Sequence, residues 1–462
     1  MALHRGSMSS GSDQRSSNPV VTEANPALGE RLEPPKSRLA AAPVPADVAY
    51  ELIHSELTLD GSARLNLATF VTTWMEPQAR QLMSECVDKN IIDKDEYPQT
   101  AELERRCVAI LADLWHAPDP ERATGCSTTG SSEACMLAGL ALKKRWAARV
   151  DDSQRRPNLV MGANVQVCWE KFCRYWDVEP RIVPMSGDRF HLGAEEAVAL
   201  CDEDTIGVVV ILGSTFDGSY EPVAEVAAAL DELASDGPDV PIHVDGASGA
   251  MIAPFLDPDL MWDFRLPRVA SINTSGHKYG LVYPGVGWVL WRDADALPRE
   301  LVFDVDYLGG DMPTFALNFS RPGAEVVAQY YTFFRLGHEG FRAVQQASRD
   351  VATYLSAAVG DLPQFRLISR GDELPVFAFT TSDTVEGWDA FALSRTLRER
   401  GWQVPAYRFP ADRQDLAVLR IVCRNGFGHD MAETFLEHLG AAVRQLEDSS
   451  SQLASGPTGF HH

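Results

Sequence analysis

A single lysine, Lys278, lies among small and polar residues in the stretch SINTSGHKYG, residues 271–280. The apolar run directly before it, residues 269–272, predicts a short buried strand. Lys278 would then follow the carboxyl end of that strand, which is the edge of an open α/β sheet where ligands bind. Burial at that edge disfavours the charged form of a lysine, so Lys278 is a candidate nucleophile that forms a Schiff base. An isolated loop lysine is more often solvated, and the neighbouring segments decide between the two interpretations.

Two further segments favour a cofactor site around Lys278. The sequence PIHVDGASG, residues 241–249, predicts a strand that ends in Asp245 and is followed by small residues, which let a flat group approach the backbone. An aspartate that keeps a pyridine nitrogen protonated and a lysine that carries an aldehyde are the pair that pyridoxal phosphate (PLP) requires. The sequence GSSEA, residues 130–134, opens a predicted helix whose free N–H groups and hydroxyls can bind a phosphate. Each segment alone is weak evidence, but their order in one chain is specific.

The composition argues against several other classes of function. The 462 residues include 41 Lys and Arg and 65 Asp and Glu, and the net charge of −24 disfavours binding to nucleic acid or to an anionic membrane. The longest apolar run, residues 206–212, is too short to span a bilayer, and the amino end lacks the apolar core of a signal peptide. The eight cysteines include no CxxC pair, so we expect reduced thiols in a cytoplasmic protein and no metal site.

Hydrophobic periodicity predicts a large α/β domain with a mostly parallel sheet, followed by a smaller α+β domain. Expected strands of the large domain are 159–161, 206–212, 242–244, 269–272 and 286–291. After residue 345 the pattern changes to strands at 376–380 and 418–422 and helices at 391–400 and 431–446. We therefore expect five parts: a disordered or loosely docked arm (1–45), a helical segment contributing to the dimer and the substrate pocket (46–100), a PLP-binding large domain (101–345), a small domain (346–446) and a flexible tail (447–462).

Longer motifs are distributed over roughly residues 47–445: NLATF (66–70), IDKDEYP (92–98), GSSEA (130–134), WDFRLP (262–267), SGHKYG (275–280), YLGG (307–310), FSRPG (319–323) and GWQVPA (401–406). In kind and order they are similar to the motifs of PLP-dependent glutamate decarboxylases of the bacterial and plant type, in the group II amino-acid decarboxylase family. The resemblance implies the fold-type I architecture of PLP enzymes, pyridoxal 5'-phosphate as cofactor, and a homodimer or a hexamer (a trimer of dimers). It also implies decarboxylation of L-glutamate at Cα to 4-aminobutanoate (GABA) and CO2 through a Lys278 Schiff base.

The resemblance also implies roles for individual residues. Lys278 corresponds to the Schiff-base lysine, Asp245 to the partner of the pyridine nitrogen, and His277 to a third catalytic group. Residues implied to bind the cofactor are Ser131, Ser132, Gln166, Thr215, Asp245, Ala247, Ser275, His277, Lys278 and, from the neighbouring subunit, Ser320. Residues implied to bind the substrate are Thr69, Phe70, Asn90 and Asp93 at the distal carboxylate and Arg420 at the α-carboxylate, with Arg424 as second choice. Gly246, where most relatives carry Ala, and residues 214–218 depart from the family's pattern.

Other functions are compatible with parts of this pattern. The chain could be another fold-type I enzyme, such as a decarboxylase of a different amino acid or an aminotransferase, or an inactive scaffold with the same fold. The intact set of Lys278, Asp245 and Ser131-Ser132 argues against the scaffold. Product analysis with glutamate separates the enzymes, because an amine and CO2 indicate decarboxylation whereas 2-oxoglutarate indicates transamination. Decarboxylation consumes one proton per turnover, so acid activation and a role in acid tolerance are further hypotheses.

Overall fold

The computed structural model describes residues 34–40, 42–150, 152, 154–305 and 312–454. The chain divides into a unit that ends at Gly61, which contains helix α1 (Ala46–Leu57), and a unit that begins at Ser62 and contains all other elements. The YLGG motif at 307–310, most of the expected arm and the last eight residues of the expected tail lie outside the described residues. Within the described ranges, no helix is both long and apolar enough to cross a bilayer.

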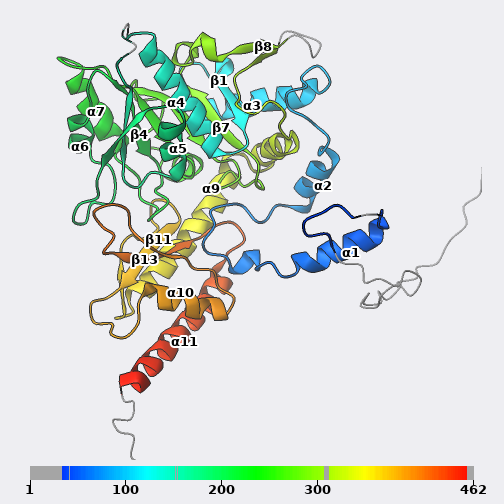
Figure 1. Ribbon diagram of the computed structural model, residues 1–462, viewed down its shortest axis with the longest axis vertical. Coiled ribbons are helices and arrows are strands. Elements are labelled where there is room, and N and C mark those ends of the chain that lie inside the picture. The colour runs from blue at the N-terminus through cyan, green and yellow to red at the C-terminus, as the bar shows by residue number, and fades with distance from the viewer. Residues whose placement is uncertain (1–33, 41, 151, 153, 306–311, 455–462) are drawn as a thin grey trace, which may run out of the picture. The chain divides into compact units, whose positions relative to one another are not determined.

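A seven-stranded sheet, counted over the described residues, forms the centre of the second unit (Figure 1). Its strands, in spatial order, are β1 (Thr124–Thr128), β7 (Gly287–Trp291), β6 (Val269–Thr274), β5 (Ile242–Asp245), β4 (Thr205–Ile211), β2 (Asn158–Gly162) and β3 (Glu179–Val183). The run from β6 to β3 is parallel, whereas β7 is antiparallel to both of its neighbours. The expected mostly parallel sheet is confirmed, and β1 and β3 are strands that the periodicity did not predict.

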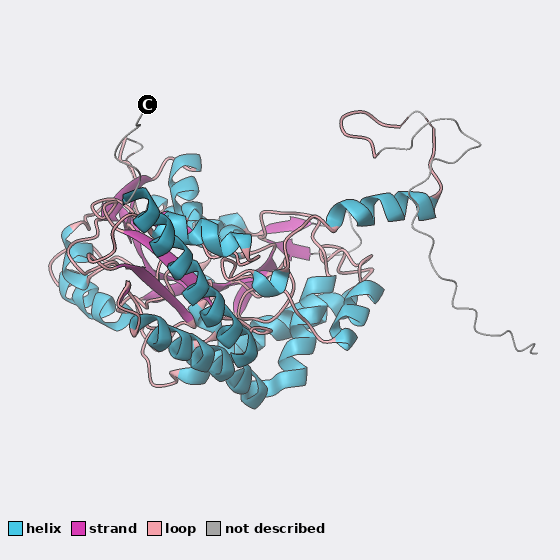
Figure 2. Cartoon of the chain, turned by 90° about the horizontal axis from the view of Figure 1, so that it is seen from below, coloured by secondary structure: helices cyan, strands magenta, loops and turns pink. Residues whose placement is uncertain are grey.

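The strands β2, β4, β5, β6 and β7 are buried on both faces, which explains the nearly continuous apolar run of β4. On β4, Val208 and Val210 pack into one core cluster, whereas Val209 and Ile211 pack into another. Alternate residues of a strand point to opposite faces, so β4 contributes to both clusters. The first cluster includes residues of α3 (Pro98–Leu114) and α7 (Val223–Leu233), and the second includes residues of α4 (Ser131–Ala147) and α5 (Val167–Tyr175). Figure 2 shows strands enclosed by helices in this way.

In the described part of the chain, a four-stranded antiparallel sheet forms the smaller domain. Its order is β10 (Phe365–Leu367), β11 (Val376–Thr381), β13 (Ala417–Val422) and β12 (Ala406–Arg408). Helices α10 (Ala390–Glu399) and α11 (His429–Ala454) pack with it around a separate apolar core. Helix α9 (Ala324–Gly360) contributes Phe333 and Phe341 to the core of the large sheet and Leu355 to that of the small sheet, and Figure 1 shows it extending between them.

Helix boundaries differ from the expected domain limits. The limits after residues 100 and 345 fall inside α3 and α9, and α11 continues to Ala454 although the tail was expected to begin at 447. The backbone of α9 is interrupted at Gly337, where φ is 57°. Glycine adopts this conformation without steric strain, so α9 consists of two helical stretches that meet at a kink at Gly337.

The segment 66–72 connects the two sheets through its backbone. The Leu67 N–H donates to the Gln403 carbonyl, and the Leu67 carbonyl accepts from Val422 on β13. Five residues later, the Thr72 N–H donates to the carbonyl of His277 in the loop after β6. We call residues 66–72 the connecting segment, since it fixes the small domain beside the edge of the large sheet.

The buried strand β6 gives a test of the core. Ile272 is fully buried on β6, whereas Ile182 on the edge strand β3 is 37% exposed. We expect Ile272→Ala to lower the free energy of unfolding by about 2–5 kcal/mol, because it removes buried methyl groups and leaves a cavity. Urea unfolding of both variants measures the effect. Ile182→Ala is the matched control, and equal losses for the two would contradict the placement of β6 in the core.

Candidate active site

The carboxyl ends of β5 and β6 bring Asp245 and Lys278 to the same edge of the sheet. Asp245 is the last residue of β5 and pairs in register with Asn273 on the parallel strand β6. Lys278 lies in the loop that follows Thr274, the last residue of β6. Because these strands are adjacent and parallel, residues far apart in the sequence become neighbours at one edge.

The Lys278 ammonium lies between a hydroxyl and an aromatic ring. Its Nζ atom is 3.4 Å from Ser248 Oγ and 5.2 Å from the centroid of the Phe70 ring. The backbone of the same residue is fixed, since its carbonyl accepts a 2.6 Å hydrogen bond from Thr72 Oγ1. Burial lowers the pKa of Lys278, although the Asp245 carboxylate opposes the shift. A lysine with a lowered pKa supplies more of the neutral amine, which is the nucleophilic form.

The Asp245 carboxylate is buried and accepts several hydrogen bonds. Its Oδ2 atom accepts from Trp169 Nε1 at 2.9 Å, and its Oδ1 atom accepts from Asn273 Nδ2 and from the Ala247 N–H, both at 3.2 Å. The residue is only 4% exposed. A carboxylate can be kept in such a position when hydrogen-bond donors replace the water that it loses.

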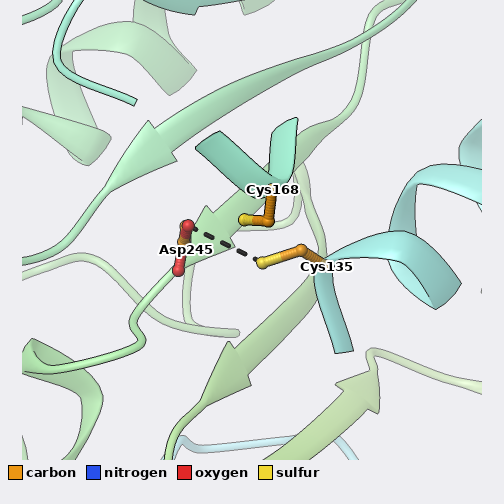
Figure 3. A group of neighbouring side chains, drawn as sticks. All are labelled: Cys135, Cys168 and Asp245. Carbon is orange, nitrogen blue, oxygen red and sulfur yellow. Dashed lines mark hydrogen bonds between the residues drawn. The ribbon is translucent and has the colours of Figure 1, made fainter. Parts of the chain in front are cut away.

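Two thiols complete the surroundings of Asp245 (Figure 3). Cys135 from α4 lies with its sulfur 3.7 Å from Asp245 Oδ2, and the Cys168 sulfur from α5 lies beside it, the three ligand atoms being within 4.8 Å of one another. A metal ion would require thiolates, but burial raises the pKa of Cys135 well above its usual value. We therefore interpret Cys135 as a neutral thiol packed against the Asp245 carboxylate. Cys173, five residues after Cys168, is not part of this group.

The start of α4 and the loop after β6 form a concentration of hydroxyl and N–H groups. Ser131 is the first residue of α4 and accepts a hydrogen bond from Asn273 Nδ2. Gly130 precedes it at φ 156°, and a Cβ atom there would lie 2.9 Å from the His277 ring. Ser275 is buried, and its Oγ atom has no hydrogen-bond partner among the described residues. A buried hydroxyl without a partner beside the amino end of a 17-residue helix is suited to an anion. Ser132 is exposed.

Three further residues expected at the cofactor occupy loops around this edge. The Ala247 carbonyl accepts from the Ser275 N–H at 3.1 Å, which links the loop after β5 to the loop after β6. The Thr215 carbonyl accepts from the Arg420 guanidinium. Gln166 is exposed and caps α5 by accepting from the Cys168 N–H at 2.7 Å, on the helix whose Trp169 reaches Asp245.

Two cations lie close to the Phe70 ring. The Arg420 guanidinium is 4.7 Å from the centroid of its ring, and Lys278 Nζ is 5.2 Å from the same centroid. Arg420 also donates to the Ala68 carbonyl at 2.6 Å, yet its buried Nε atom has no partner among the described residues. In Arg424, by contrast, Nε and one terminal nitrogen donate to backbone carbonyls. Arg420 is therefore the better candidate to bind a carboxylate beside Lys278.

The residues expected around the distal carboxylate fall into two groups. Thr69 adjoins Phe70, and its Oγ1 atom accepts from the Val71 N–H at 3.1 Å, which leaves the hydroxyl hydrogen available. Asn90 belongs to a second group, in which its Nδ2 atom donates to Asp93 at 3.0 Å and lies 3.3 Å from Ser320 Oγ. Among the described residues, the side chains of Asn90 and Asp93 bond to each other and to the loop that contains Ser320. One chain therefore does not bring Thr69 and Phe70 into contact with Asn90 and Asp93.

The comparisons with known proteins agree with this arrangement. Residues 43–382 match the model of the pyridoxal-dependent decarboxylase conserved domain. The chain is 53% identical to the glutamate decarboxylase of Aliivibrio fischeri, over 90% of this chain and 91% of that protein. It is 48% identical to glutamate decarboxylase beta of Listeria innocua, over 93% and 95%. The solved Lactobacillus brevis glutamate decarboxylase superposes with a TM-score of 0.87 at 47% identity, over 90% of this chain and 96% of that one.

The chain belongs to the pyridoxal-dependent decarboxylase family. A Burkholderia pseudomallei sphingosine-1-phosphate lyase shares the fold, with a TM-score of 0.77 at 24% identity. The expected fold-type I architecture is thereby confirmed.

The residues present fit the cofactor of this decarboxylase family. A phosphate needs donors, and the unpartnered Ser275 hydroxyl and the free N–H groups at the start of α4 supply them. A pyridine nitrogen needs a buried acid, which Asp245 provides, and an aldehyde needs an amine of lowered pKa, which Lys278 provides.

Sequence reasoning missed several residues that contact these groups. Trp169 and Asn273 donate to Asp245, and the fully buried His243 contacts both of them. Asn273 lies within the stretch that was singled out for its lysine, and strand register alone would have placed it beside Asp245. Trp169 could not be found in this way, because the orientation of α5 does not follow from the sequence pattern.

His277 gives a test of burial at the site. Burial, reinforced by the charge of Lys278, lowers the pKa of His277 from 6.5 to about 4. The unfolded chain therefore binds more protons between these values, and stability is lost as pH falls through the window. We expect the free energy of unfolding of the protein to fall more steeply from pH 6.5 to 4 than that of His277→Gln. Urea unfolding across pH measures the difference. His429→Gln, at an exposed histidine, is the control and should follow the unsubstituted protein.

Proposed function

We propose that this chain is a glutamate decarboxylase that converts L-glutamate to 4-aminobutanoate and CO2 with pyridoxal phosphate as cofactor. Two observations support the proposal: relatives named for this activity are about half identical over nine-tenths of the chain, and Lys278, Phe70 and Arg420 form one contiguous group. When bound, the cofactor supplies an aldehyde that takes up the substrate's amine and a ring that accepts the electrons of the breaking bond between Cα and the carboxylate.

The roles proposed for the chain's own residues follow from their surroundings. Asp245 keeps a proton on the ring nitrogen through its carboxylate, which the donors from Trp169 and Asn273 hold in one orientation. Ser131, Ser132, Ser275 and His277 bind the phosphate, and Gln166, Thr215 and Ala247 lie along the ring. The lists of phosphate and ring contacts stay predictions, since Ser132 in the first list and Gln166 in the second are exposed in this chain.

Lys278 is the residue that we propose to hold and move the proton. After CO2 departs, Cα must receive a proton, and Lys278 and His277 are the two candidate donors. Burial lowers the pKa of His277 to about 4, so its ring is neutral at neutral pH and a poor acid there. Lys278 Nζ, which lies within 3.4 Å of Ser248 and beside Phe70, is therefore the favoured donor.

Substrate binding is proposed to use both groups of polar residues. Arg420, whose buried Nε has no partner among the described residues, binds the α-carboxylate. Thr69 and the backbone of Phe70 bind the distal carboxylate of glutamate. We propose that Asn90, Asp93 and Ser320 act at the site of a neighbouring subunit, because they form their own group within one chain. The assembly would then be a dimer or a trimer of dimers. Sedimentation of the active protein tests this, and a fully active monomer would contradict it.

Two physiological proposals accompany the reaction. The consumed proton supports a role in acid tolerance, and eight free cysteines support a cytoplasmic location. A rate of CO2 release that does not change between acid and neutral pH would contradict acid activation.

Lys278→Ala should abolish decarboxylation. Without the amine, borohydride reduction should no longer attach the cofactor to the peptide that contains Lys278, as detected by mass spectrometry. The matched control is Lys171→Ala, on the exposed side of α5, which should retain both activity and attachment at Lys278. Undiminished CO2 release from Lys278→Ala would refute the proposed role of this lysine.

Glutamate should be preferred to aspartate, because the shorter acid leaves donors near Thr69 unpaired. Each unpaired group costs about 1–3 kcal/mol, so we expect kcat/KM to differ by at least about tenfold. Thr69→Val removes the hydroxyl at nearly constant volume and should narrow the preference. Thr353→Val, on α9, is the control, since its hydroxyl bonds only within that helix among the described contacts. Equal kcat/KM for the two acids in the unsubstituted protein would contradict this pocket.

A further inference from the structure

Asn273 joins the two ends of the candidate cofactor site. Its Nδ2 atom lies 3.2 Å from Asp245 Oδ1 and 2.5 Å from Ser131 Oγ, so the two amide hydrogens point to different partners. Asp245 is the candidate partner of the ring nitrogen, and Ser131 begins the helix proposed to bind the phosphate. Asn273 is fully buried. One amide therefore connects the groups expected at opposite ends of the cofactor.

His243 determines which way the Asn273 amide faces. Its Nε2 atom is 2.8 Å from Asn273 Oδ1, and its Nδ1 atom is 2.8 Å from Ser271 Oγ. Burial lowers the pKa of His243 to about 4, so at neutral pH the ring carries one N–H. With that hydrogen on Nε2, the ring donates to Asn273 and accepts from the Ser271 hydroxyl, which satisfies all three residues. A flipped amide would instead turn its oxygen toward the Asp245 carboxylate, and the two acceptors would repel each other.

The same histidine also contacts the other donor to Asp245. The His243 ring packs against Trp169 with centroids 5.1 Å apart and an angle of 58° between the planes. Trp169 donates to Asp245 Oδ2, whereas Asn273 donates to Oδ1. Both residues are fully buried, as is His243. His243 thus supports the donors to both oxygens of the carboxylate from a position without access to substrate.

We propose that His243 and Asn273 are positioning residues that hold the Asp245 carboxylate and the Ser131 hydroxyl at a fixed separation. This inference rests on the proposed function, since it assumes that Asp245 receives the ring nitrogen and Ser131 the phosphate. The separation selects a ligand that has both a basic ring nitrogen and a phosphate. Loss of Asn273 should therefore weaken the recognition of the phosphate and of the ring together, although Asn273 touches neither.

The first readout is ligand binding by the purified full chain after removal of cofactor. Dissociation constants are measured by absorbance titration for pyridoxal phosphate and for pyridoxal, which lacks the phosphate. The dissociation constant of pyridoxal divided by that of pyridoxal phosphate reports how much the phosphate contributes to binding. In Asn273→Ala we expect this ratio to fall by about threefold to tenfold, because the Ser131 hydroxyl loses a hydrogen-bond partner. A residue with a purely structural role would weaken both ligands equally and leave the ratio unchanged.

The second readout is kinetic. We expect Asn273→Ala to lower kcat for glutamate by about tenfold or more, because Asp245 loses a donor to its charged oxygen. KM for glutamate should change little, since the proposed substrate contacts at Phe70 and Arg420 are separate from Asn273. The loss should therefore lie mainly in kcat.

Asn158→Ala is the matched control. Asn158 is also fully buried in the same sheet, where it donates to Asp202 at 2.9 Å and accepts from Thr205 at 2.8 Å. It begins β2 and so lies at the opposite edge of the parallel strands. This variant should lose thermal stability but keep the binding ratio and kcat.

Two variants of His243 test the same inference if Asn273→Ala does not fold. His243→Gln keeps an N–H that can reach Asn273, whereas His243→Leu removes it. We expect the glutamine variant to retain much more of the binding ratio and of kcat than the leucine variant. Unchanged ratio and kcat in folded Asn273→Ala, or equal values for the two His243 variants, would overturn the inference. If the unsubstituted protein neither binds pyridoxal phosphate nor releases CO2 from glutamate, the proposed function fails and this inference falls with it.

Discussion

A carboxylate with almost no access to water lies at the centre of this structure, and the arrangement around Asp245 follows from the free energy of keeping it there. A buried charge is costly unless hydrogen-bond donors replace its hydration. Trp169, Asn273 and the Ala247 N–H supply those donors, and each comes from a different element of the large domain. The helix α5, the strand β6 and the loop after β5 are therefore fixed relative to one another by their shared acceptor.

The parallel sheet makes this convergence possible. In parallel strands all carboxyl ends meet at one edge, so the polar residues that follow buried strands gather there. The small antiparallel sheet adds Arg420 from β13, and the connecting segment 66–72 brings Phe70 close to both Arg420 and Lys278. The ring attracts both cations, which lowers the cost of their proximity.

The buried inner strands and the position of Lys278 could be predicted from the sequence, whereas the edge strands and the packing of distant loops could not. The apolar runs that became β4, β5 and β6 are buried on both faces, so their pattern was strong and the position of Lys278 followed. β3 was missed because most of its residues are not buried. β1 was missed because the sequence TGCST carries little apolar signal. Gly246 looked like a simple departure from the family's pattern, yet a Cβ atom there would lie 2.5 Å from Ala250 Cβ, a close approach that no local pattern encodes. The grouping of Asn90 with Asp93 and Ser320 likewise depends on how distant loops pack.

The contacts of the connecting segment constrain the order in which parts of the protein fold during synthesis. Leu67 is paired with Gln403 and Val422, and Ala68 accepts from Arg420, so residues near the amino end depend on partners more than 330 positions later. Closing such a long loop carries an entropic cost that is offset only when both ends exist. The large sheet can collapse while the ribosome is still translating, but the hydrogen bonds of Leu67 with Val422 and of Ala68 with Arg420 cannot form until β13 has been made. A nascent chain would thus contain Lys278 and Asp245 well before it could bind an amino-acid substrate. Assembly of the substrate pocket is therefore a late step of folding.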